Sequence, residues 1–176
     1  MTGKSIILIG MAGVGKSTIG VSLARVLGFS FIDVDRYIEE KDGKTIQQII
    51  DDHGDEALLE LEKRRMHEVV LDSKVVAPGG SIIYHADLME YLKQSSVLVY
   101  LHDSLENIEE KLAGEMERGI VGLKDKSLRQ IYEERTPLYT RYADITINCP
   151  GKSLAQIVEE IRRRYTESDK SSPRRD

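Results

Sequence analysis

The stretch SIILIGMAGVGKSTIG, residues 5–20, decides the fold, because it sets a glycine-rich turn between an apolar run and an amphipathic segment. SIILIG has the length and the β-branched content of a buried strand, and the apolar spacing that follows predicts a helix over residues 17–27, closed by Gly28. A strand, a glycine-rich turn and a helix in this order form a common phosphate-binding unit. We therefore expect a nucleotide-binding α/β protein.

The glycine-rich turn fits the P-loop pattern G-x-x-x-x-G-K-[ST] over residues 10–17. Its glycines let backbone N–H groups turn inward around phosphate oxygens, and the following helix directs the positive end of its dipole at them. Lys16 is expected to reach the β- and γ-phosphates, and the Ser17 hydroxyl is expected to bind Mg²⁺. The predicted nucleotide-binding residues of this turn are Gly10, Ala12, Gly13, Val14, Gly15, Lys16, Ser17 and Thr18.

Four further apolar runs alternate with helical patterns along the chain. We predict strands at residues 29–35, 74–80, 96–102 and 143–149. We predict helices at residues 45–54, 55–71, 104–114, 128–138 and 153–165. Capping boxes at Thr45 with Gln48 and at Ser153 with Gln156 mark two helix starts. Strands that alternate with helices imply βαβ units, so the expected fold is a parallel sheet with helices on both faces.

Length and composition favour one ordinary domain. The chain has 176 residues and no long linker, so we expect a single domain over residues 1–166 and a polar, disordered tail over 167–176. The net charge of −5 does not favour nucleic acid or an anionic membrane as a partner, and the first apolar run is too short for a signal segment or a membrane span. The single cysteine, Cys149, favours a reducing compartment. We expect a cytoplasmic monomer.

Three functions can follow from a P-loop: phosphorylation of a small molecule, switching as a GTPase, or nucleotide binding by a non-catalytic regulator. A switch GTPase should carry an N-K-x-D guanine motif, and the sequence has none. The segment DDHG, residues 51–54, matches D-x-x-G, but it lies at a predicted helix end rather than after a strand. A small-molecule kinase is therefore favoured, and a regulator that binds ATP without turnover remains the alternative from another class.

Carboxylates follow the second predicted strand. Asp33 and Asp35 are two residues apart, so in extended backbone both side chains project from one face, at the sheet edge where ligands usually bind. One carboxylate could order the waters of Mg²⁺, and the other could accept the hydroxyl proton of the acceptor. Asp103, after the fourth predicted strand, is a rival Mg²⁺ contact, although it could equally cap the helix beside Ser104.

The order and spacing of six segments resemble the shikimate kinase family. These segments are GMAGVGKST (10–18), FIDVDRYIE (31–39), GDEALLELE (54–62), VVAPGGS (75–81), ERGIV (117–121) and RTPLYTRYAD (135–144). The resemblance covers about residues 4–165. It implies a P-loop fold of the nucleoside monophosphate kinase type, with a five-stranded parallel sheet and a lid, expected over residues 112–125. It also implies transfer of the γ-phosphate of ATP to a hydroxyl of shikimate.

The resemblance assigns catalytic roles to residues of this chain. It implies that Asp35 holds the acceptor hydroxyls and acts as the base, and that Asp33 supports Mg²⁺. Together with Lys16, Arg118 in the lid would contact the ATP phosphates. Lys111 stands where the family often has an arginine against the adenine.

The resemblance also outlines the acceptor site and shows where this chain departs from the family. Gly79 and Gly80 would bring backbone N–H groups to the acceptor, and Arg135 would pair with its carboxylate. The family's second carboxylate-binding arginine is replaced by Leu59, and its third glycine by Ser81. A charge-assisted hydrogen bond is worth about 1.5–3 kcal/mol, or roughly 10- to 150-fold in affinity. Gluconate, homoserine and threonine are therefore alternative acceptors to shikimate.

Overall fold

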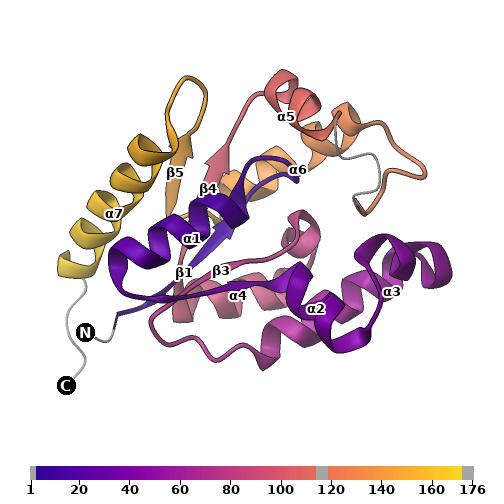
Figure 1. The fold of residues 1–176 in the computed structure, drawn as a ribbon, viewed down its shortest axis with the longest axis horizontal. Helices are drawn as coiled ribbons and strands as arrows, with labels where there is room; N and C mark the ends of the chain where they lie inside the picture. The colour runs from indigo at the N-terminus through magenta and orange to yellow at the C-terminus, as the bar shows by residue number, and fades with distance from the viewer. Residues whose placement is uncertain (1–2, 114–118, 172–176) are drawn as a thin grey trace.

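The computed structural model describes residues 3–113 and 119–171, and five parallel strands form its sheet in the order β2-β3-β1-β4-β5 (Figure 1). The strands are β1 (Ser5–Ile9), β2 (Ser30–Asp33), β3 (Lys74–Ala77), β4 (Ser96–His102) and β5 (Ile145–Asn148). The helices are α1 (Lys16–Leu27), α2 (Val34–Asp42), α3 (Ile46–Glu68), α4 (Ala86–Ser95), α5 (Leu105–Leu112), α6 (Leu128–Tyr142), α7 (Leu154–Ser171) and the short 3₁₀ helix η1 (Gly80–Tyr84). The five-stranded parallel sheet with helices on both faces is confirmed.

Two hydrophobic cores lie on opposite faces of the sheet, because successive side chains of a strand point to opposite sides. Ile6 and Leu8 of β1 pack under α1 and α7, whereas Ile7 and Ile9 pack in the core that α2, α3, α4 and α6 cover. All four side chains are at most 1% exposed. β1 therefore reads as a continuous apolar run, as a strand covered on both faces should.

The position of β1 in the sheet determines where the P-loop lies. β1 pairs with β3 on one side and with β4 on the other, and the chain builds outward from it in both directions. The strand order reverses at this point, and such a switch point leaves a crevice at the carboxyl ends of the strands. The turns after β1, β2 and β3 consequently meet at one edge of the sheet (Figure 1).

The second strand ends earlier than the sequence predicts. β2 stops at Asp33 and α2 begins at Val34, so the expectation that Asp33 and Asp35 share an extended strand is wrong. The reason is local: the Asp33 side chain accepts a hydrogen bond from the N–H of Arg36 and thereby caps α2. Asp33 thus becomes the cap, and Asp35 lies in the first helical turn.

Other helix boundaries both confirm and correct the sequence analysis. The predicted break at Gly54 is present inside α3, where this glycine has φ 84° and ψ 173°. The final helix, α7, continues to Ser171, six residues beyond its predicted end at residue 165. It thus extends into the tail that was expected to be disordered. Residues 172–176 of this tail lie outside the described part. An ion pair between Arg163 and Glu167, one turn apart, supports this extension. Helices α2 and α4 were not predicted.

No helix in the described ranges combines the length and the apolar character that a membrane crossing requires.

Both predicted capping boxes are confirmed. The Thr45 hydroxyl accepts from the N–H of Gln48 while Gln48 Oε1 accepts from the N–H of Thr45, and Ser153 and Gln156 form the same reciprocal pair. These side chains satisfy N–H groups that a helix start otherwise leaves without partners.

Thr45→Ala should lower the free energy of unfolding by about 1 kcal/mol, because it removes the acceptor that caps α3. Urea denaturation followed by circular dichroism measures this loss. Thr140→Ala is the matched control: its exposed hydroxyl only donates to the Thr136 carbonyl within α6, so the change should stay within about 0.5 kcal/mol. Equal losses in the two variants would contradict the capping role.

Candidate active site

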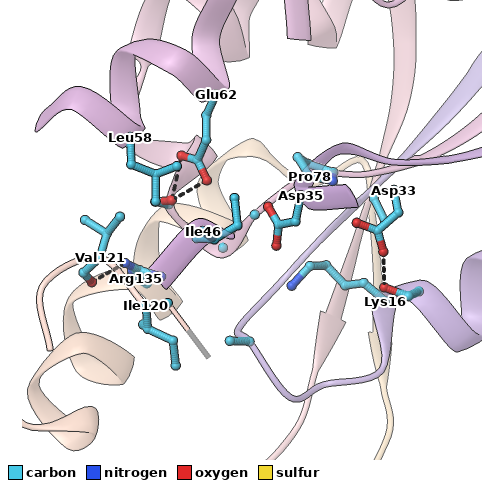
Figure 2. Close-up of a pocket in the computed structure, with 17 residues that line it drawn as sticks. Lys16, Asp33, Asp35, Ile46, Leu58, Glu62, Pro78, Ile120, Val121 and Arg135 are labelled. Atoms are coloured by element: carbon cyan, nitrogen blue, oxygen red, sulfur yellow. Dashed lines mark hydrogen bonds between the residues drawn. The ribbon is translucent and has the colours of Figure 1, made fainter. Parts of the chain in front are cut away.

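Three strand ends enclose a small polar cavity (Figure 2). The P-loop follows β1, the start of α2 follows β2, and the turn over residues 78–81 follows β3. The cavity has a volume of about 30 Å³. Its ionisable or hydroxyl-bearing lining residues are Lys16, Ser17, Asp33, Asp35, Glu62, Ser81 and Arg135. The sequence segments that supply them are far apart, so only the parallel sheet brings them together.

The P-loop glycines are required by the backbone geometry. Gly10 has φ +148°, and a Cβ there would lie 2.7 Å from the carbonyl oxygen of Leu101 on β4. Gly15 has φ +98° and precedes the first residue of α1. Only glycine adopts such angles without strain. The turn carries Lys16 back over the loop, where its Nζ donates to the carbonyls of Gly10 (2.8 Å) and Met11 (3.0 Å).

The other predicted nucleotide-binding residues of the P-loop are distributed between the cavity, the hydrophobic core and the protein surface. Ala12 lines the cavity, and Val14 is buried in the core beneath α1 and α7. Gly13 lies against α5, where a Cβ would come within 3.1 Å of Leu112. Thr18 is exposed and lines a neighbouring groove of about 1160 Å³ beside α2 and α3.

Ser17 and Asp33 form a pair of oxygen ligands at the start of α1. The Ser17 hydroxyl donates to Asp33 Oδ2 at 2.5 Å, which joins the P-loop helix to the end of β2. A hydroxyl and a carboxylate at a phosphate-binding turn fit Mg²⁺, which prefers oxygen donors and takes its other ligands from nucleotide phosphates and water. The donor chemistry of this pair is therefore suited to Mg²⁺.

The rival carboxylate, Asp103, is held in a different network. Its Oδ2 accepts from Lys111 Nζ and its Oδ1 from the Asn107 amide, both at 2.7 Å, and it also accepts from the N–H of Ser104. Burial alone would raise the pKa of Asp103, but the hydrogen bonds from Lys111 and Asn107 outweigh it, so the pKa is lowered. Asp103 and Lys111 do not line the cavity, which favours Asp33 as the Mg²⁺ ligand.

The turn after β3 brings bare backbone against the functional side chains. A Cβ on Gly79 would lie 2.2 Å from Glu62 Oε1 and 3.1 Å from Asp35 Oδ1. A Cβ on Gly80 would lie 3.0 Å from a terminal nitrogen of Arg135. Gly79 has φ −56°, which any residue adopts, so the requirement at this position is space rather than backbone angle. A side chain at either glycine would displace a group that lines the cavity.

Glu62 is a site residue that the sequence analysis missed. Its side chain is 2% exposed, and Ser81 Oγ lies 2.8 Å and 2.6 Å from its two carboxyl oxygens. Burial, and then the nearby charge of Asp35, raise the pKa of Glu62 to about 8. Leu58, Glu62 and Met66 are spaced four residues apart and form the buried stripe of α3. A glutamate in the middle of an apolar stripe is the sequence signal that could have identified it.

Arg135 points into the protein and is 1% exposed. One terminal nitrogen donates to the carbonyl of Val121 (2.8 Å), and Nε donates to the Tyr84 hydroxyl (3.2 Å). Ile120 and Val121, which lie within the expected lid, also line the cavity, so this described part of the lid segment covers it (Figure 2). Arg118, the predicted lid arginine, lies outside the described residues.

The expectation that Leu59 lines the acceptor site differs from the structure. Leu58 lines the cavity, whereas Leu59 packs against the hydrophobic core next to it. The cavity faces the stripe of α3 that Leu58 shares with Glu62, one helical turn apart, and Leu59 is rotated away from that stripe. Ser81, the other departure, does line the cavity.

Comparison with known proteins identifies relatives over nearly the whole chain. The shikimate kinase family model matches residues 12–166. A shikimate kinase of Persephonella marina is 39% identical over 160 residues, which are 90% of this chain and 96% of the relative. The structure of shikimate kinase from Acinetobacter baumannii in complex with shikimate superposes with a TM-score of 0.87 at 30% identity, over 94% of each chain. A gluconokinase from Sinorhizobium meliloti shares the fold, with a TM-score of 0.57 at 22% identity, over 94% of this chain and 93% of the other.

Gly79→Ala should lower the free energy of unfolding by about 1–3 kcal/mol, because the new methyl group overlaps the Glu62 carboxyl group. In a Glu62→Ala background the clash is absent, so adding Gly79→Ala should cost less than about 0.5 kcal/mol. Urea denaturation of the two single variants and the double variant measures this coupling. The same loss in both backgrounds would mean that the glycine serves the backbone and not Glu62.

Proposed function

The chain belongs to the shikimate kinase family, and on this premise we propose that it transfers the γ-phosphate of ATP to a hydroxyl group of shikimate, which gives shikimate 3-phosphate. It is therefore an ATP-dependent small-molecule kinase. The observation that carries the proposal is that Lys16 of the P-loop, Asp35 and the buried Arg135 line one cavity. The family model matches residues 12–166, which include Lys16, Asp35 and Arg135.

The P-loop supplies the nucleotide half of the reaction. Its backbone N–H groups and the start of α1 attract the triphosphate, and Lys16 exchanges its two loop carbonyls for phosphate oxygens. We propose that Ser17 and Asp33 hold Mg²⁺, which neutralises phosphate charge when it is bound. The roles of Arg118 at the phosphates and of Lys111 at the adenine stay predictions. Catalysis then rests on positioning and charge neutralisation.

Asp35 and Arg135 supply the acceptor half. Asp35 is half-buried at the cavity and takes the hydroxyl proton as the acceptor oxygen attacks the γ-phosphorus. The new O–P bond forms, the bond to the β,γ-bridging oxygen breaks, and ADP leaves. Arg135 pairs with the acceptor carboxylate, and Gly79 and Gly80 present backbone beside it.

Acceptor binding requires the segment over the cavity to move. A volume of about 30 Å³ holds little more than a water molecule, so shikimate does not fit beneath Ile120 and Val121 as they lie. The Val121 carbonyl also occupies the Arg135 nitrogen that would meet the acceptor. Opening of residues 119–121 releases both constraints, and reclosure excludes water from the reaction. The monomeric state and the cytoplasmic location stay predictions.

ADP release with ATP and Mg²⁺ should be fastest with shikimate in a panel that also holds gluconate, homoserine, threonine and no acceptor. The physical reason is that shikimate offers both a hydroxyl for Asp35 and a carboxylate for the buried Arg135. A coupled assay of ADP formation measures it. No ADP formation with shikimate, together with turnover of another acceptor, would overturn the proposed substrate. Tight ATP binding without turnover on any acceptor would favour the regulator.

Asp35→Asn should lower turnover by about 10²- to 10⁴-fold, because the amide does not accept the hydroxyl proton. ATP affinity, measured by calorimetry, should change little, since Asp35 serves the acceptor half. Asp52→Asn is the matched control: this exposed carboxylate pairs with Lys44 outside the cavity, so turnover should keep its wild-type value. Unchanged turnover in Asp35→Asn while ATP still binds would contradict the role of Asp35 as the base.

A further inference from the structure

We propose that Glu62 is a specificity-determining residue of the acceptor site, and that an acceptor carrying a carboxylate binds the form of the enzyme in which Glu62 holds a proton. Proton binding at Glu62 and acceptor binding at Arg135 would then be thermodynamically coupled. The inference deepens the proposed function and rests on it, since shikimate brings the carboxylate. The role of Glu62 is exerted through the charge of the cavity and not through the transferred phosphate.

The carboxyl group of Glu62 is fixed in the cavity wall (Figure 2). It is 2% exposed, and one of its oxygens lies 2.2 Å from the point where a Gly79 Cβ would be, so it fills the space that the glycine leaves. Ser81 Oγ lies 2.8 Å from one carboxyl oxygen and 2.6 Å from the other. The carboxyl group is therefore held away from bulk solvent.

The Ser81 hydroxyl can partner the Glu62 carboxyl group in either protonation state. A hydroxyl has a single hydrogen and donates to one of two oxygens at a time. When Glu62 is ionised, Ser81 donates to one carboxyl oxygen and stabilises the charged form, so this hydrogen bond lowers the pKa of Glu62. When Glu62 carries a proton, Ser81 Oγ can accept from it, so the protonated carboxyl group also keeps a hydrogen-bond partner.

Charged groups from three helices face Glu62. Asp35 comes from α2, Lys16 from α1 and Arg135 from α6, and Ser81 faces it from η1. Burial is the largest influence and raises the pKa of Glu62 to about 8, helped by Asp35 and opposed by Ser81, Arg135 and Lys16. When ATP is bound, its phosphates neutralise Lys16. Among the described residues that line the acceptor half, Asp35 and Glu62 carry carboxyl groups and Arg135 carries a guanidinium.

The charge of Glu62 determines how strongly an anionic acceptor is repelled. If Glu62 is ionised, an acceptor carboxylate enters beside one more buried negative charge, and repulsion is poorly screened there. If Glu62 holds a proton, that repulsion falls and Arg135 is available to the acceptor carboxylate. A neutral acceptor is not repelled by ionised Glu62, so its affinity should depend little on the protonation state of Glu62. Protonated Glu62 therefore favours acceptors that carry a carboxylate.

The sign of the pH dependence follows from the raised pKa. Below pH 7 Glu62 holds its proton and affinity for shikimate should be flat, whereas above it the binding-competent fraction falls. With a pKa of about 8, affinity for shikimate should fall about tenfold between pH 7 and pH 9. The methyl ester of shikimate, which has no charged carboxylate, should show a much smaller change.

Isothermal titration calorimetry of the full chain with shikimate and with its methyl ester, at pH 6.5 to 9 and in two buffers of different ionisation enthalpy, tests the coupling. Wild-type enzyme should lose about tenfold in shikimate affinity between pH 7 and pH 9, and proton uptake should approach one per shikimate at pH 9. In Glu62→Gln the ratio of the shikimate affinity at pH 7 to that at pH 9 should be close to one. Glu60→Gln changes an exposed position on the same helix and is the matched control. Its shikimate affinity should fall between pH 7 and pH 9 as much as that of the wild-type enzyme.

A second variant tests the geometry without removing the carboxyl group. The Ser81 hydrogen bond lowers the pKa of Glu62, so Ser81→Ala should move the midpoint of the affinity profile to higher pH. A merely structural role of Ser81 would change affinity at every pH and leave the midpoint in place.

The outcomes separate this inference from the proposed function. Shikimate turnover at pH 7 with a flat wild-type affinity profile, or a tenfold fall that persists in Glu62→Gln, overturns the inference and leaves the kinase activity standing. An unmoved midpoint in Ser81→Ala also overturns it. Failure of shikimate to bind or react at pH 6.5 and at pH 7 overturns the proposed function, and this inference with it.

Discussion

The close approach of bare backbone at the ends of neighbouring strands is the constraint on which the rest of the active site depends. Gly10 at the end of β1 passes so near the Leu101 carbonyl of β4 that a Cβ would lie 2.7 Å from it. Gly80, after β3, lies close enough to the Gly10 carbonyl that its own Cβ would be 3.3 Å away. Side chains at these positions would push the turns apart, and the phosphate-binding turn would separate from the acceptor side.

The same close approach creates an unusual electrostatic environment. Gly79 leaves room for the carboxyl group of Glu62, and Gly80 leaves room for the guanidinium of Arg135, so two ionisable groups are buried within one small cavity. Burying a charge is costly unless it is paired or hydrogen-bonded. Arg135 meets this cost with the Val121 carbonyl and the Tyr84 hydroxyl, and Glu62 meets it with Ser81.

The two departures from the family pattern have different consequences in the fold. Leu59 packs against the core beside the site and leaves Arg135 as the cation of the acceptor half among the described residues that line the cavity. Ser81 lies inside the site and adds a hydroxyl that neighbouring Glu62 uses. The P-loop over residues 10–17 keeps the family pattern, whereas Lys111 stands where the family often has an arginine. Departures from the family pattern therefore occur in segments expected on both the nucleotide side and the acceptor side.

Features that depend on neighbours within one or two helical turns could be predicted from the sequence. The P-loop, the capping boxes at Thr45 and Ser153, and the break at Gly54 were all predictable, because backbone angles and cap hydrogen bonds are set locally. The alternation of apolar runs with helical patterns likewise predicted the parallel sheet.

The set of residues that lines the cavity, by contrast, depends on how distant segments pack. Glu62 meets Ser81 across 19 positions of sequence, and Arg135 meets Val121 across 14, so no local pattern could place them together. The rotation of α3 brought Leu58 rather than Leu59 to the site, since packing of the whole helix on the sheet fixes which stripe turns inward. The raised pKa of Glu62 has the same origin, because burial and the approach of Asp35 exist only once the sheet has assembled.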